Sequence, residues 1–327
     1  MSTKPLERVA IIGASGRIGG AFAEELLKTG KHTVTALKRK GSDSKLPDGV
    51  KVVEVDYDDE AALVEALKGQ QFLAVTLSVR APDGVHTKIC AAAGKAGVPY
   101  VMPNTYGYPA LLRDPALLRD PADTYRKRVL DRLQDVENNG FSAWINLACG
   151  FWYEWSLATG EQWFGFTIKE RKVTFFDDGK RPITVSTWDQ CGRAFAALLS
   201  LPESGASPSL ADFKNKTVNI SSWSVSQRDM LDSLHRVLGT TDADWEITYE
   251  PTAKRIQEGV AELSKGDFKG FAKSLYGGVF APGNPASDYA RTHGTSNEVL
   301  GLPKEDLDAA TEKTVDMVES GWNPFAL

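Results

Sequence analysis

The sequence has few residues of the kinds that build disulfide frameworks and metal centres. Its 327 residues include only three cysteines and four histidines. Cys90, Cys149 and Cys191 are far apart and form no C-x-x-C, and the histidines do not join them at metal-ligand spacing. We therefore expect reduced thiols in the core, and we expect neither a disulfide scaffold nor a bound metal.

A long apolar run and an excess of positive charge are also missing. No stretch approaches the roughly 20 apolar residues of a membrane span, and residues 1–5 do not resemble a signal peptide. The formal net charge of -5 gives no global attraction to nucleic acid or to an anionic membrane. We expect a cytoplasmic protein with neither nucleic acid nor a membrane as its main partner.

The first half alternates apolar runs with helical patterns. Val9-Ala-Ile-Ile12 is an unbroken apolar run, as a strand buried on both faces requires. Further strands are expected at residues 32–37, 50–55, 72–77, 98–102 and 141–149, with helices at 61–67, 86–96 and 124–139. Such alternation predicts an α/β fold with a doubly wound parallel sheet, a Rossmann domain.

The second half is less regular and predicts a smaller α+β domain. Strands at residues 172–176 and 183–187 flank an Asp-Asp-Gly turn, which predicts a hairpin. A strand at 217–220 and helices at 226–238 and 304–318 follow. Before this half, the hexapeptide Pro-Ala-Leu-Leu-Arg-Asp occurs twice, beginning at Pro109 and at Pro115. It is either a lid near the site or a neutral surface insertion.

A glycine-rich turn follows the first strand. In Gly13-Ala-Ser-Gly16-Arg-Ile-Gly19 the first glycine permits the tight turn, the second lets a pyrophosphate approach the backbone, and the third lets helix and strand pack closely. The N-terminus of the following helix then offers free N–H donors to phosphates. The motif therefore predicts a dinucleotide site, with a purely structural turn as the alternative. Its expected contacts are Gly13, Ser15, Gly16, Arg17, Ile18 and Gly19.

The end of the second strand indicates which dinucleotide binds. An NAD site has an acidic residue there for the ribose 2′-hydroxyl, whereas an NADP site has basic residues for the 2′-phosphate. This chain has Lys38-Arg39-Lys40 and no carboxylate. Because Arg39 can clamp a phosphate bidentately and Lys38 adds charge, we expect NADP(H). A solvated basic turn is the alternative.

Four segments together resemble the NmrA-like and isoflavone reductase-like families, which are atypical short-chain dehydrogenases/reductases. They are the glycine turn, Ala36-Leu-Lys-Arg39, Val55-Asp-Tyr-Asp58 and Val101-Met-Pro-Asn-Thr-Tyr-Gly107. The resemblance implies an NADP-binding Rossmann domain at residues 1–150 and a substrate domain mainly at 151–327. Segments near 183–223 are expected to return to the Rossmann core. It also implies cofactor contacts from Arg39, Asp56, Tyr57, Thr76, Leu77, Ser78, Asn104, Cys149 and Phe151.

The sequence gives fewer signals for catalytic residues than for the cofactor site. No Tyr-x-x-x-Lys occurs in the helix where ordinary members of the superfamily carry it. Isoflavone reductase-like enzymes use a lysine on this helix, so the resemblance implies that Lys127 contacts the cofactor and relays a proton. A solvated helix face is the alternative. Tyr106 and Tyr153 are the other candidate proton donors.

An aromatic run suits a flat, apolar substrate, although ordinary core packing is the alternative. Its expected substrate contacts are Tyr106, Tyr108, Phe151, Trp152, Tyr153 and Trp155. Two functions follow from these expectations. The first is an NADPH-dependent reductase of a hydrophobic aromatic or conjugated carbonyl or enone compound. The alternative is a non-catalytic NADP(H)-sensing regulator of the NmrA type that acts through a protein partner.

Overall fold

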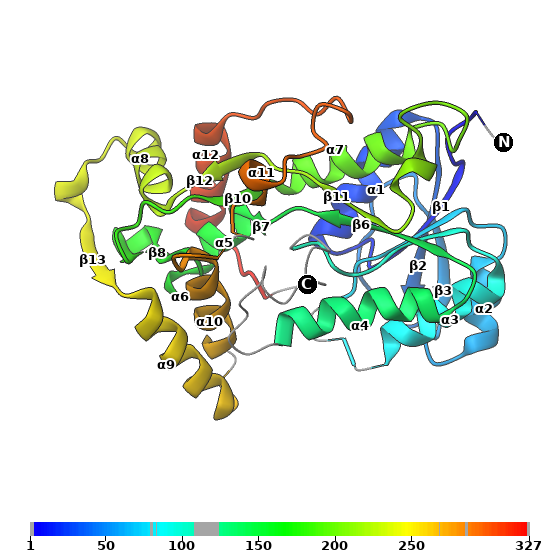
Figure 1. Ribbon diagram of the computed structural model, residues 1–327, viewed down its shortest axis with the longest axis horizontal. Coiled ribbons are helices and arrows are strands. Elements are labelled where there is room, and N and C mark those ends of the chain that lie inside the picture. The colour runs from blue at the N-terminus through cyan, green and yellow to red at the C-terminus, as the bar shows by residue number, and fades with distance from the viewer. Residues whose placement is uncertain are drawn as a thin grey trace.

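A large parallel sheet forms the core of one lobe of the computed structural model (Figure 1). The structure describes residues 3–78, 81–82, 84–107, 124–267, 269–284 and 287–325. Within them the neighbouring strands of this sheet are all parallel. In spatial order they are β11 (Lys216–Asn219), β6 (Ala143–Ala148), β5 (Tyr100–Met102), β4 (Phe72–Val75), β1 (Arg8–Ile12), β2 (Thr33–Arg39) and β3 (Lys51–Val55).

Helices cover both faces of this sheet, which explains the unbroken apolar run in β1. Val9 and Ile11 join the core under one helical layer, and Ala10 and Ile12 join the core under the other. The first layer is α1 (Arg17–Thr29) and α7 (Trp188–Leu199), and the second is α2 (Glu60–Leu67), α3 (Val85–Ala96) and α4 (Thr124–Asn138) (Figure 1). The predicted doubly wound Rossmann architecture is confirmed.

The chain leaves the large sheet after β6 and later returns to it. Helix α7 packs against α1, where the rings of Phe22 and Phe195 stack with centroids 4.2 Å apart. The helices approach so closely at Gly192 that an added Cβ would lie 2.6 Å from the carbonyl oxygen of Ala21. Strand β11 then extends the sheet beyond β6. The domain division near residue 150 stays a prediction.

The second lobe contains two small sheets and a set of short helices. Its strands are β7 (Phe151–Trp152), β10 (Ile183–Ser186) and β12 (Trp223–Val225) in one sheet, and β8 (Phe166–Thr167), β9 (Lys172–Phe176) and β13 (Glu246–Glu250) in the other. Its helices are α5 (Tyr153–Thr159), α6 (Glu161–Phe164), α8 (Gln227–Leu238), α9 (Thr252–Ser264), α10 (Lys269–Phe280), α11 (Tyr289–Thr292) and α12 (Leu307–Glu319), with 3-10 turns at Ile168–Glu170 and Asp242–Asp244. A further 3-10 turn, Leu210–Phe213, lies in the first lobe beside β11. Among the residues described, no helix is long and apolar enough to cross a membrane.

The hairpin predicted from residues 172–187 is wrong. The turn itself forms, since Asp177 has φ of +54° and the Gly179 N–H donates to the Phe176 carbonyl at 3.0 Å. However, β9 lies between β8 and β13, so both of its edges are already occupied. Asp177 also anchors the start of α9, because its carboxylate accepts from the Thr252 N–H at 2.9 Å and hydroxyl at 2.7 Å. Strand β10 therefore pairs in the other sheet.

Candidate functional site

The glycine turn after β1 is folded tightly against the end of β4. Gly13 has φ of +82°, and the Gly16 N–H donates to its carbonyl at 2.9 Å. A Cβ on Gly13 would lie 2.7 Å from Oγ1 of Thr76, and a Cβ on Gly19 would lie 2.5 Å from the same atom. Both contacts are too short for any side chain. The two glycines therefore let the turn and α1 pack directly against the end of β4, and we call residues 13–19 the glycine cradle.

Thr76 holds the two strands together beneath this cradle. Its backbone N–H donates to the Ile12 carbonyl at 2.9 Å, and its hydroxyl donates to the same oxygen at 2.6 Å. Strands β1 and β4 are neighbours where the strand order of the sheet reverses. Ligands of open α/β sheets bind at the carboxyl ends of the strands at this reversal. The cradle therefore lies where such a fold binds its ligand.

The N-terminus of α1 faces the cradle without a capping side chain. Its N-cap residue is Gly16, which makes no side-chain hydrogen bond to the first turn, and that turn contains no acidic residue. Uncapped N–H groups and the helix dipole favour an anion at this position. The chemistry of the turn therefore fits the phosphates of a dinucleotide.

The carboxyl end of β2 presents basic side chains beside this turn. Arg39 is exposed, and none of the described acidic side chains forms an ion pair with it. Lys38 lies 3.8 Å from Glu54. Tyr57 packs below, with its hydroxyl donating to the Leu37 carbonyl at 2.7 Å, and burial raises its pKa to about 12. Asp56 is exposed, and its carboxylate accepts the N–H of Asp58, two residues further on.

The ends of β4, β5 and β6 lie on the other side of the glycine turn from β2. Asn104 donates its amide to the Leu77 carbonyl at 2.8 Å, and Ser78 is exposed nearby. Cys149 is fully buried, and its N–H donates to the Tyr106 carbonyl at 2.8 Å. The sequence therefore brings these predicted cofactor residues to one edge of the sheet.

Comparison with known proteins identifies the first lobe. Residues 13–131 match the model of an NAD(P)H-binding family, and this range contains the cradle, the basic end of β2 and the edge formed by β4 and β5. This part of the chain is similar to an NAD(P)H-binding domain. The expectation of a nicotinamide dinucleotide is thereby confirmed.

Two curated proteins and several solved structures are similar to this chain. Oxidoreductase aprR of Aspergillus flavus is 27% identical over 92% of this chain and 96% of its own length. Quinone oxidoreductase 2 of Escherichia coli is 35% identical over 36% of this chain and 41% of its own length. Two similar structures are AtPrR2 with NADP+ and (+)pinoresinol, with TM-score 0.75, 17% identity and coverage of 94% and 99%, and an isoflavone reductase, with TM-score 0.71, 19% identity and coverage of 96% and 100%. The predicted isoflavone reductase-like fold is confirmed.

The aromatic run beyond the NAD(P)H-binding domain does not form one wall. Phe151 packs on Tyr276, with ring centroids 4.3 Å apart, whereas Trp152 packs against the core under α1 and α7. Tyr153 is fully buried and its hydroxyl lies 2.7 Å from that of Thr311. Trp155 is partly exposed. The neighbouring rings therefore point in different directions, because a short strand here leads directly into α5.

The two candidate tyrosines are held as structural groups. The Tyr106 hydroxyl donates to the Val75 carbonyl at 2.7 Å, and its ring packs edge-on against Phe22. Burial raises the pKa of Tyr106 and of Tyr153 above the ordinary value for tyrosine. Each hydroxyl is hydrogen-bonded within the protein, and the roles of Tyr106 and Tyr153 as proton donors stay predictions.

Lys127 lies on a solvated face of α4. Its side chain is 72% exposed, and its Nζ lies 2.6 Å from Oδ2 of Asp131, one helical turn further on. This geometry favours the solvated-face alternative over a proton relay. Tyr108 and the duplicated hexapeptide lie outside the described residues, so their predicted roles stay predictions.

The sequence analysis did not predict the environment of Glu154. Its carboxyl is completely buried at the start of α7, where both oxygens accept from the backbone N–H of Trp188 at 3.3 Å and one lies 3.9 Å from Nζ of Lys313. Burial raises its pKa to about 7.

Trp188 and Trp322 flank the guanidinium of Arg17, although they lie at opposite ends of the second half of the chain. No local pattern could link these positions to the glycine turn.

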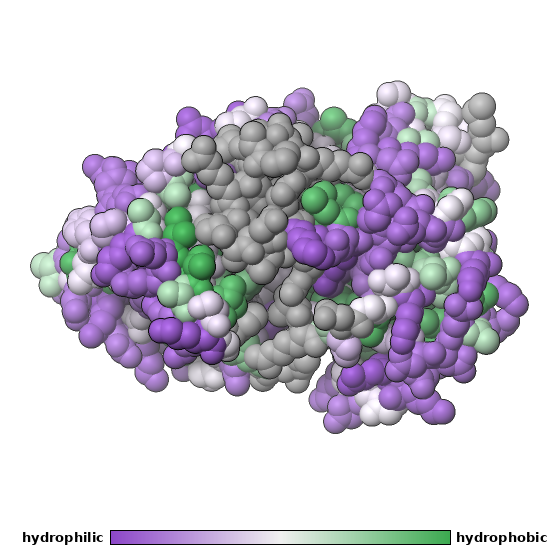
Figure 2. Space-filling view, turned by 60° about the horizontal axis from the view of Figure 1, so that its bottom comes forward, coloured by the Kyte–Doolittle hydropathy of each residue, from purple (hydrophilic) through white to green (hydrophobic). Residues whose placement is uncertain are grey.

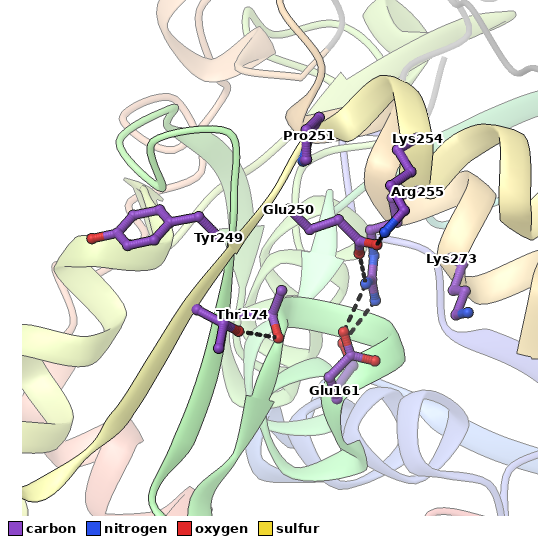
Figure 3. Close-up of a pocket in the computed structure, with 9 residues that line it drawn as sticks. Glu161, Thr174, Tyr249, Glu250, Pro251, Lys254, Arg255 and Lys273 are labelled. Carbon is purple, nitrogen blue, oxygen red and sulfur yellow. Dashed lines mark hydrogen bonds and ion pairs between the residues drawn. The ribbon is translucent and has the colours of Figure 1, made fainter.

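A hollow of about 350 Å³ in the second lobe is lined by charged side chains (Figure 3). Its floor is Arg255, whose Nη1 lies 2.7 Å from a Glu161 carboxylate oxygen and 2.8 Å from one of Glu250. Lys273, on the rim, pairs with Glu262 at 2.5 Å. Nη2 of Arg255 also donates to the Glu161 carbonyl at 2.9 Å, so the network joins α6, β13 and α9 and is structural. Within the described ranges, no group of three His, Cys, Asp or Glu side chains is placed to hold a metal.

Proposed function

We propose that the chain is an NADPH-dependent reductase of a hydrophobic small molecule, an aromatic or conjugated carbonyl or enone compound. The observation that carries this proposal is the glycine cradle against Thr76, beside an uncapped helix N-terminus and the basic end of β2. Bound NADPH would supply the hydride. The protein's own work is to bind the dinucleotide, orient it and hold the substrate beside it.

Arg39 is the residue proposed to select NADPH over NADH. Its exposed guanidinium stands at the end of β2, without an acidic partner among the described residues, and the 2′-phosphate of NADP offers it a bidentate anionic acceptor. Tyr57 packs below this position as support for the adenosine. The dinucleotide phosphates are proposed to lie on the turn from Gly13 to Gly19.

The substrate class is supported by the relatives and by the surface between the lobes. The names of similar proteins include an isoflavone reductase and a quinone oxidoreductase, and isoflavones and quinones are conjugated carbonyl compounds. On the face shown in Figure 2, patches of apolar side chains border the grey atoms on both sides, and the outer ends of the molecule are mainly hydrophilic. A flat apolar compound suits such a surface.

Cofactor choice tests the proposed binding site. The fluorescence of NADPH and of NADH is titrated with the unaltered protein, with Arg39→Gln and with Lys31→Gln. Lys31 is exposed at the opposite end of β2, so it is a matched loss of one positive charge. Arg39→Gln is expected to weaken NADPH binding by about 10- to 100-fold and to leave NADH binding unchanged. Equal effects of the two variants would contradict the assignment.

Turnover tests the reductase itself. A panel of aromatic ketones, enones and quinones is added to the NADPH complex, and oxidation is followed at the absorbance of the reduced nicotinamide. Oxidation that requires one of these compounds supports the reductase, and tight binding of both redox forms without turnover would contradict it. Because Lys127 is exposed and paired with Asp131, we expect Lys127→Ala to retain at least half of the activity. A tenfold loss would restore Lys127 as the proton relay.

A further inference from the structure

The last described residues of the chain reach back to the glycine turn. We call residues 322–325 the C-terminal strap. The strap follows α12, to which the Trp322 N–H is tied by a 3.0 Å hydrogen bond to the Met317 carbonyl. From there it crosses to Arg17, the first residue of α1. Figure 1 shows the C-terminus between the two lobes.

The strap grips the guanidinium of Arg17 from two directions. Nη1 donates to the Pro324 carbonyl at 3.0 Å and Nη2 donates to the Asn323 carbonyl at 3.1 Å. The guanidinium carbon also lies 4.6 Å from the centroid of the Trp322 ring and 5.9 Å from that of Trp188. Burial among these groups lowers the pKa of Arg17. Nη1 and Nη2 of the guanidinium therefore both donate to neutral carbonyl oxygens of the strap.

The other end of the strap touches the second lobe. Phe325 packs edge-on against Trp155 of α5, with ring centroids 6.4 Å apart. Trp322 and Trp188 lie with ring centroids 6.3 Å apart. Phe325 is half exposed. The strap thus connects Arg17 of α1 with Trp155 of α5.

We propose that the C-terminal strap is a displaceable cover of the dinucleotide and substrate site, released when a phosphate of the dinucleotide replaces its carbonyls on Arg17. This proposal rests on the proposed function, because it requires a dinucleotide at the glycine turn. A guanidinium and a phosphate carry opposite charges and can form two parallel hydrogen bonds, whereas each strap carbonyl is a neutral acceptor. The exchange is therefore favourable for Arg17, and it removes the two hydrogen bonds that hold the Asn323 and Pro324 carbonyls on α1.

Hydrogen exchange measures the release directly. The amide exchange of the peptide covering residues 320–327 is followed by mass spectrometry in the full chain, without dinucleotide and with saturating NADPH or NADP+. The exchange of this peptide is expected to be several-fold faster with either dinucleotide, while that of β1 is unchanged or slower. Binding with unchanged or slower strap exchange overturns this proposal alone. No dinucleotide binding to the unaltered protein overturns the proposed function together with it.

A variant of the strap tests the competition independently. Trp322→Ala removes the ring that covers Arg17, so less has to be displaced, and NADPH binding is expected to tighten by about threefold. The matched control is Tyr249→Ala, an exposed aromatic residue of β13 in the second lobe, for which no change is expected. Weaker or unchanged NADPH binding by Trp322→Ala overturns the proposal. Strap exchange in dinucleotide-free Arg17→Ala is expected to match that of the NADPH complex.

Discussion

Gly19 and Gly20, which are neighbours in the first turn of α1, should respond in opposite ways to substitution by alanine. A Cβ at Gly19 would lie 2.5 Å from Oγ1 of Thr76 and 2.8 Å from the carbonyl carbon of Gly13, whereas a Cβ at Gly20 has its nearest neighbour, the Ala14 carbonyl oxygen, at 3.6 Å. Overpacking costs about 1–3 kcal/mol, and we take about 3 kcal/mol at Gly19 because the atoms met there belong to the backbone and to a buried threonine whose hydroxyl is held by the Ile12 carbonyl. Alanine gains about 1 kcal/mol of helix propensity at either position.

The net expectation is a loss of about 2 kcal/mol for Gly19→Ala and a gain of about 1 kcal/mol for Gly20→Ala. At about 2 °C per kcal/mol, the melting temperatures should move by about 4 °C down and about 2 °C up. Calorimetry measures both, and NADPH titration should show about tenfold weaker binding for Gly19→Ala alone, because α1 must move away from the strand. Equal melting temperatures for the two variants would refute the close packing described here.

Two buried charged groups give further predictions. Burial raises the Glu154 pKa to about 7, so its protonated form favours folding; this stabilisation is complete below the unfolded pKa of about 4.3 and is lost as the pH rises through 7. Glu154→Gln should therefore melt above the unaltered protein at pH 8 but not at pH 4.5, and an equal difference at both pH values would contradict this. Arg255→Ala leaves two carboxylates facing each other and should lower the free energy of unfolding by about 3–5 kcal/mol in denaturant titrations, with NADPH affinity unchanged. A loss below about 1 kcal/mol would show that the network is not structural.

Local patterns predicted the NAD(P)H-binding domain because its determinants are close in sequence. Strand β1, the turn from Gly13 to Gly19 and α1 are consecutive, and each residue type there has one physical reason. The helix predicted at residues 226–238 is α8, and its capping box joins Ser226 and Asp229, which are only three residues apart. A local sequence pattern predicts structure correctly where the contacting residues lie within one turn of a helix or within one strand.

The second lobe was predicted poorly because its partners are distant. The turn after β9 had the composition of a hairpin, but the strand that pairs with β9 begins at Glu246, some seventy residues further on. Phe151, Trp152 and Tyr153 read as one aromatic wall, yet the passage from strand to helix sends them into separate packing environments. The contacts of Arg17 with Asn323 and Pro324 span almost the whole chain.

The place of β11 at the edge of the sheet has a consequence for synthesis of the chain. Until residue 219 has left the ribosome, the outer edge of β6 has unpaired backbone groups, and until α7 is made the apolar face of α1 is uncovered. A fragment ending near residue 150 would keep both surfaces open and would be prone to pair with other chains. The nucleotide-binding half is thus completed only by residues that follow it, and it is not a module that can be excised or transplanted on its own.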